Sequence, residues 1–142
     1  MATLNSATNY LEHNLLNFIF KNNSNSFATL GNSIYVGLAT AVANAETGSL
    51  TEATFGSYAR QQVNASNWTL TASNVDSQVC NNTANIEWPT SSGTNNTVTH
   101  VFLADALTGG NILFVGQLDS PRTIQQGDIF RINATNLSFE LK

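Results

Sequence analysis

Few residues in this sequence have the types and spacing that catalysis or metal binding requires. His13 and His100 are the only histidines and stand far apart, and Cys80 is the only cysteine. A structural zinc site needs about four such ligands. A lone cysteine is more often a small, partly buried side chain than a nucleophile. We therefore predict no metal site and no role in catalysis for these three residues.

The acidic residues and glycines do not form a recognisable catalytic motif either. A glycosidase needs two facing carboxylates, but the acids are scattered along the chain and no pair stands out. The sequence has neither a Gly-x-Ser-x-Gly nucleophile elbow nor a glycine-rich phosphate loop. We predict a protein that is not an enzyme and that has no catalytic residues and no cofactor.

Arg60 is the charged residue with the clearest potential role. It follows Tyr58 by two positions in a segment that we expect to be extended, so the two side chains should share one face. A guanidinium in such a place can stack on a ring or pair with a carboxylate such as Asp105 or Asp128. We predict a structural ion pair, with Asp128 as the partner, rather than contact with a substrate.

Three aromatic residues suggest a second kind of site. Tyr58, Trp68 and Trp88 could form a platform on which sugar rings stack, if all three lie on an exposed face. Packing in the core is the alternative for each of these side chains. The sequence leaves both options open.

The one substantial helix is predicted over residues 6–21, with Ser6 or Asn5 as its cap. Apolar residues recur there at three- and four-residue steps, and Leu11, Leu15 and Phe18 belong to this stripe. The helix should either cover its own sheet or dock on a partner through these three residues. Further apolar side chains lie off the stripe, which indicates a helix that is apolar on more than one side; these are Tyr10, Leu16 and Phe20.

The rest of the chain, about 33–142, predicts a β domain, and residues 1–142 are expected to form a single domain. About eight short strands separated by turns favour an antiparallel β-sandwich or a jelly-roll-like fold. Gly37 in the first strand predicts close approach of another element. Other expected features are an inner strand over Phe55–Val63 and a hairpin with its turn at Gly109-Gly110-Asn111. We also expect an exposed loop or a short helix over Ala41–Thr54 and an exposed loop over Thr90–Asn96.

Composition excludes several classes of partner. The net charge is -4 with five Lys and Arg, which argues against nucleic-acid binding and against a basic membrane-binding patch. No apolar run has the length of a membrane span, and the N-terminus does not resemble a signal peptide, so we expect synthesis in the cytoplasm. Charged residues make up 10% of the chain, against about 25% in average domains. Such a surface suits permanent contact with other copies, although a soluble monomer is the alternative.

A series of short motifs runs through nearly the whole chain: Ser6-Ala7-Thr8-Asn9-Tyr10-Leu11-Glu12, Ile34–Thr40, Gly56–Gln61, Ile86–Thr90, Val98–Val101, Gly109–Phe114 and Gly127-Asp128. In its order this series resembles a family of small virion structural proteins of tailed bacteriophages, described as tail-fibre-like or minor tail proteins. The resemblance implies a non-enzymatic, β-rich subunit present in many copies on the particle, and it carries over no catalytic residues.

Two functions from different classes follow. The first is a virion structural protein of the tail, the baseplate or the capsid surface, where it could be a decoration (cement) protein that holds neighbouring subunits together. Its partners would be other virion proteins and copies of itself. The second is an adsorption module that binds a host surface glycan through Tyr58, Trp68 or Trp88. A small hydrolase is a third alternative, for which the sequence selects no residues.

Overall fold

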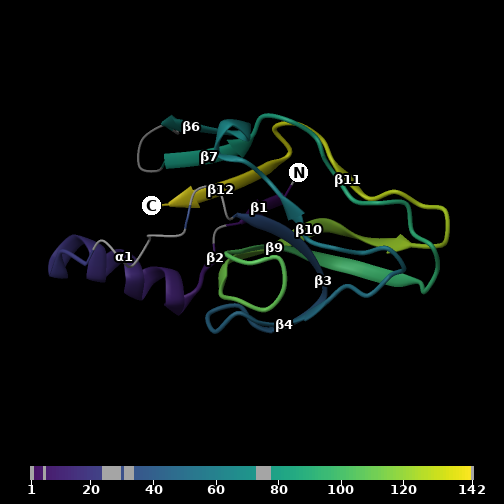
Figure 1. Ribbon diagram of the computed structural model, residues 1–142, viewed down its shortest axis with the longest axis horizontal. Helices are drawn as coiled ribbons and strands as arrows, with labels where there is room; N and C mark the ends of the chain where they lie inside the picture. Colours follow the sequence, from purple (N-terminus) through teal and green to yellow (C-terminus); the bar gives the residue numbers. More distant parts are fainter. Residues whose placement is uncertain (1, 5, 24–29, 31–33, 73–77, 142) are drawn as a thin grey trace.

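The protein is a β-sandwich with an N-terminal α-helix and, in the described residues, a short 3-10 helix at Ala65–Asn67, as described by a computed structural model (Figure 1). The structure describes residues 2–4, 6–23, 30, 34–72 and 78–141. One sheet has the order β1 (Ala2–Leu4), β12 (Leu137–Leu141), β7 (Gln78–Asn82), β6 (Trp68–Ala72). The second has the order β2 (Ser6–Ala7), β10 (Ile112–Ile124), β9 (Asn96–Ala104), β3 (Tyr35–Asn44), β4 (Ser49–Glu52), with β5 (Gln61–Gln62) also paired to β3. A two-stranded sheet joins β8 (Ile86–Glu87) to β11 (Arg131–Ile132), and α1 spans Asn9–Lys21. The predicted mainly β, antiparallel fold with an N-terminal helix is confirmed.

The core lies between the two large sheets. Val36 and Leu38 of β3, Val101 of β9 and Leu137 of β12 are fully buried in one apolar cluster. Burial of such side chains contributes about 1.5–3 kcal/mol each. Among the described strands, β1 and β12 pair in parallel, while the other pairs are antiparallel.

Strands β9 and β10 form the predicted hairpin around Gly109 and Gly110, both of which have positive φ. The side chains of β9 do not alternate strictly between the two faces of the sheet, because Val98 and Val101 both face the core. The cause is an irregular register: Gln117 pairs with His100 and Arg122 with Val98, so residues 118–121 of β10 stand opposite Thr99 alone. A bulge of this kind changes which face the following residues occupy.

The helix begins later than the sequence predicted. Ser6 and Ala7 pair with Val115 and Phe114 of β10, so these two residues add a short strand instead of a first helical turn. The cap is Thr8, whose hydroxyl accepts a hydrogen bond from the Leu11 amide and donates to the Ile112 carbonyl at 2.6 Å. Sheet pairing therefore fixes the start of α1, and the prediction of Ser6 or Asn5 as the cap is wrong.

Two further boundaries differ from prediction. Most of Ala41–Thr54 is not a loop, because β3 extends to Asn44 and β4 pairs back with it around a turn at Gly48. The predicted inner strand over Phe55–Val63 is reduced to β5, and its first half is irregular. The predicted loop over Thr90–Asn96 is confirmed up to Asn95. Ser33 and Lys142, the ends of the predicted β domain, lie outside the described residues.

Candidate functional site

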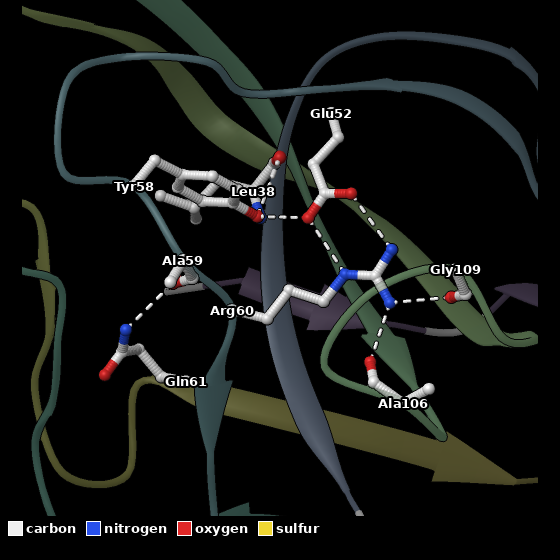
Figure 2. A network of polar contacts seen from close by, with 8 residues as sticks. All are labelled: Leu38, Glu52, Tyr58, Ala59, Arg60, Gln61, Ala106 and Gly109. Atoms are coloured by element: carbon white, nitrogen blue, oxygen red, sulfur yellow. Dashed lines mark hydrogen bonds and ion pairs between the residues drawn. The ribbon is translucent and has the colours of Figure 1, made fainter.

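Arg60 lies at the centre of a buried polar network on the outer side of β3 (Figure 2). Its Nε and Nη2 donate to the two carboxylate oxygens of Glu52, each at 2.9 Å. Its Nη1 donates to the carbonyl oxygens of Ala106 at 2.7 Å and Gly109 at 2.9 Å. The guanidinium also lies 5.1 Å from the centre of the Phe102 ring, a cation–π distance. One side chain thus joins β4, the β9–β10 hairpin loop and the surface of the sheet.

Arg60 forms an ion pair, but not with the predicted partner Asp128. The carboxylate is that of Glu52, at the end of β4. Asp128 instead accepts a hydrogen bond from the Gln125 amide within a turn, and Asp105 accepts from Asn111. Because all three nitrogens of the Arg60 guanidinium already donate within the protein, this side chain stabilises the fold and is not available to a ligand.

Tyr58 extends the same network into the backbone of β3. Its hydroxyl donates to Glu52 at 2.7 Å and accepts from the Leu38 amide at 3.0 Å. Burial raises the pKa of the Tyr58 phenol well above its usual value, and the hydrogen bond to Glu52 acts in the same direction. The phenol therefore keeps its proton and remains the donor to the carboxylate.

Replacement of Tyr58 by phenylalanine is expected to lower the free energy of unfolding by about 1–3 kcal/mol, because the Leu38 amide and Glu52 would each lose a partner. Urea unfolding followed by far-ultraviolet circular dichroism measures this difference. A matched control is Tyr10→Phe, since Tyr10 is an exposed residue of α1. If both variants were equally stable, the hydroxyl of Tyr58 would have no stabilising role.

The three aromatic residues proposed as a sugar platform do not share an exposed face. Trp88 is 1% exposed and packs edge to face on Phe130. Trp68 is partly buried against Phe139, and Tyr58 packs on the core while its hydroxyl is engaged by Glu52 and Leu38. Trp88 cannot stack on a sugar without unfolding its surroundings, so its place in the platform is wrong. Trp88 packs in the core, and Tyr58 and Trp68 are partly buried against the core.

Helix α1 carries the most exposed apolar surface of the described chain. Six of its residues are large hydrophobic side chains that remain exposed: Tyr10, Leu15, Leu16, Phe18, Ile19 and Phe20. The helix has no buried residue, and it lies at one end of the sandwich beside the start of β10 (Figure 1). Exposed apolar side chains gathered in this way typically mark an interaction site.

The structure divides the predicted docking residues of α1 between two environments. Leu11 packs against the protein's own core, whereas Leu15 and Phe18 are 37% and 48% exposed. Sequence reasoning placed Leu16 and Phe20 off the main stripe, and with Ile19 they form the more exposed face, because positions three and four apart are neighbours on a helix. Sequence alone could not show which of the two apolar faces turns inward.

Comparison with protein families gives this fold its biological setting. A family model described as podophage GP4 fiber I protein gp80 matches residues 6–140. The chain belongs to this family. The match includes α1 and nearly all of the sandwich, and it confirms the resemblance to small virion structural proteins of tailed phages. No curated protein matches the chain.

Membership of the family identifies the protein as a phage fibre or structural protein. No helix in the described part of the chain is long and apolar enough to cross a membrane. In those same residues, no three His, Cys, Asp or Glu side chains gather as a metal site would require. The feature that stands out in the described residues is the exposed apolar surface of α1 at one end of the sandwich.

Proposed function

We propose that this protein is a multi-copy structural subunit that attaches to a neighbouring subunit of the phage particle through α1. The observation that supports the proposal is the exposed apolar face of α1, with Leu16 56%, Ile19 57% and Phe20 75% exposed. An amphipathic helix that lays such a face into an apolar groove is a common mode of protein recognition. The helix would serve as the anchor and the sandwich as the body of the subunit.

Hydrogen bonds fix the first turn of α1 firmly to the sandwich. Thr8 is 1% exposed, and its backbone amide donates to the Leu113 carbonyl oxygen at 3.0 Å. The backbone amide of Asn9 donates to the backbone carbonyl oxygen of Glu46 at 2.8 Å. With the Thr8 hydroxyl on Ile112, these bonds tie the first turn to both β10 and the β3–β4 turn. A docked helix would therefore transmit force to the central sheet rather than to a loose end.

The test replaces two residues of the exposed face with acids. In phage that carry Leu16→Asp and Ile19→Asp, we expect the number of copies per purified particle to fall about tenfold or more, because a docked helix would bury two charges. Quantitative mass spectrometry of purified particles gives the copy number. Both side chains are exposed in the free subunit, so its thermal stability should change little.

A charge-matched control uses the polar face of the same helix. Asn14→Asp and Lys21→Gln change the formal charge by the same amount, and neither residue lies three or four positions from Leu16, Ile19 or Phe20. This variant should be incorporated at close to the normal level. Normal incorporation of the Leu16 and Ile19 variant would show that α1 does not attach the subunit.

The place of attachment is a separate part of the proposal, and it lies either on the tail or baseplate or on the capsid surface. Immunogold electron microscopy of intact particles distinguishes these places. Label over the head would support a capsid decoration role, and label at the tail or its tip would support a tail role. Absence of label from particles, with the protein abundant in infected cells, would contradict its role as a virion subunit.

A further inference from the structure

Strand β6 (Trp68–Ala72) lies at the edge of the four-stranded sheet. Among the described strands, β7 pairs with one side of β6 and none pairs with the other side. Figure 1 shows β6 along the margin of the molecule. Thr69, Leu70 and Thr71 are exposed, and Leu70, at 78%, is the most exposed large hydrophobic residue in the described part of the chain. An edge strand of this kind presents backbone groups with which another strand can pair.

The register of β6 and β7 indicates which backbone groups of β6 point outward. Just before the ladder, the Thr83 amide donates to the Asn67 carbonyl oxygen at 2.9 Å. Hydrogen-bonded and non-hydrogen-bonded positions alternate along an antiparallel pair of strands. Counted from Asn67, the backbone groups of Thr69 and Thr71 bond to β7. The amide and the carbonyl of Leu70 therefore both point to the free edge.

Strand β6 lacks the features that protect the edges of natural sheets, which are charged side chains, prolines and bulges. The second half of β10 also lies at an edge of the described sheets, and it contains Asp119, Pro121 and Arg122 as well as a bulge. Neither β6 nor its neighbour β7 contains a charged residue or a proline, and the two strands pair in a regular register. Nothing in the sequence of β6 therefore opposes the pairing of a further strand.

A row of apolar side chains leads across the sheet to this edge. Phe139 of β12 pairs with Cys80 of β7, and Cys80 pairs with Leu70. Residues that stand opposite each other in neighbouring strands lie on the same face of the sheet. Phe139 is buried in the core and Cys80 is partly buried against it, but Leu70 extends beyond the core. A further strand with an apolar residue beside Leu70 would continue this row.

We propose that two copies of this chain pair through β6, in antiparallel orientation about a two-fold axis at Leu70. Thr69-Leu70-Thr71 reads the same in both directions, so the segment is its own complement under this rotation. Leu70 would exchange both outward hydrogen bonds with its own copy, and Thr69 would stand opposite Thr71 of the second copy. Cross-strand pairs of threonines are stabilising.

The absence of charge favours a second copy as the occupant of this edge. A two-fold interface brings each residue close to its own copy, so a charged residue at the axis would repel itself. Strands β6 and β7 contain no such residue, and the apolar row would run through Leu70 from one subunit into the other. The inference does not depend on attachment through α1, because it concerns contact between copies of the subunit.

The first test is sedimentation velocity of the purified full-length protein, which should show a monomer–dimer equilibrium between about 1 and about 300 μM. Leu70→Pro removes the outward amide and should raise the dimer dissociation constant about tenfold or more. Because this amide makes no bond to β7, the fold should persist, as thermal unfolding would verify. Leu70→Lys, which places two ammonium groups at the axis, should have the same effect and decides the matter if the proline variant is unstable. Leu70→Val keeps the amide and an apolar side chain, so this matched control should dimerise normally.

Engineered disulfides test the register. Each variant also carries Cys80→Ala, since Cys80 stands opposite Leu70 within the same subunit and would compete. Leu70→Cys should form a disulfide between subunits, because opposite Cα atoms of a hydrogen-bonded pair lie about 5.5 Å apart. Thr69→Cys alone should not, because its copy would lie about 8 Å away, beyond the reach of a disulfide. A mixture of Thr69→Cys and Thr71→Cys proteins should form the mixed disulfide, which non-reducing gel electrophoresis detects.

Four results would overturn the proposal. The first is a well-folded protein that stays monomeric over the whole concentration range, and the second is a dimer that Leu70→Pro and Leu70→Lys leave unchanged. The third is a dimer that the Leu16→Asp and Ile19→Asp variant abolishes, which would assign self-association to α1. The fourth is cross-linking of Thr69→Cys alone as readily as of Leu70→Cys, which would contradict the axis at Leu70. The copy number per particle is a separate measurement, so a failure of β6 pairing would leave the attachment role of α1 standing.

Discussion

Replacement of Arg60 by methionine is expected to lower the free energy of unfolding by about 3 kcal/mol, toward the lower end of the range for breaking a buried ion pair. Methionine keeps much of the apolar stem but removes every donor. The carbonyl oxygens of Ala106 and Gly109 and both oxygens of Glu52 would lose their partner. The Glu52 side chain is 31% exposed, so it can recover part of its hydration, which limits the loss. Urea unfolding measured by circular dichroism gives the value.

The control for Arg60 is the same substitution in a second ion pair, which is exposed to solvent. Arg131 pairs with Glu87, but the two side chains are 50% and 46% exposed. Exposed pairs contribute about 0–1 kcal/mol, so Arg131→Met should change stability little. Equal effects of the two substitutions would mean that the Arg60 network contributes no more than a surface pair. A larger effect at Arg60 would assign the difference to burial and to the two carbonyl acceptors.

The partner of Arg60 shows where sequence reasoning reaches its limit. The residue types correctly indicated a structural ion pair, because a strand arginine in a weakly charged chain needs a carboxylate. The choice of partner depends on strand pairing over long range. The sequence predicts a loop or a short helix over Ala41–Thr54 and so gives no strand pairing for Glu52, whereas the pairing of β3 with β4 brings Glu52 beside Arg60. The pattern of small residues in that segment did not reveal a paired strand.

The hairpin of β9 and β10 was predictable because its signal is local. Glycines at positions 109 and 110 accept the positive φ of the turn, and apolar residues flank them on both sides. The bulge in β10 was not predictable in the same way, because a proline lacks the amide donor of a regular strand and Pro121 therefore gives no sign that the strand continues through residue 124.

For the helix, too, some features follow from the local sequence and others depend on tertiary contacts. Its apolar content and approximate span follow from periodicity, and the sequence already indicated more than one apolar face. The helix begins at Asn9 instead of the predicted residue 6, because Ser6 and Ala7 pair with β10 and Thr8 supplies the cap. Which face remains exposed depends on how the first turn is fixed to β10 and the β3–β4 turn, and that information is tertiary.

The second large effect is expected at Gly37, where the sequence predicted close approach of another element. The approaching element is the ring of Phe102: a Cβ at position 37 would overlap Cζ and lie 2.6 Å from Cε1 and Cε2. The ring is fully buried, and the guanidinium of Arg60 covers it at 5.1 Å. Gly37→Ala should therefore lower the free energy of unfolding by about 3 kcal/mol, the upper part of the range for overpacking. Urea unfolding measures the loss.

A double variant separates this clash from a general intolerance of β3 to change. Phe102→Leu shortens the side chain that Gly37 accommodates, although it also leaves space and removes the ring beneath Arg60. If the clash causes the loss, the two substitutions together should cost at least about 1 kcal/mol less than the sum of their separate effects. Strict additivity would place the cost of Gly37→Ala elsewhere, in the backbone of β3. Non-additivity would instead show that Gly37 and Phe102 are coupled through direct contact. The absence of a side chain at Gly37 would then make room for the Phe102 ring, on which the guanidinium of the buried ion pair rests.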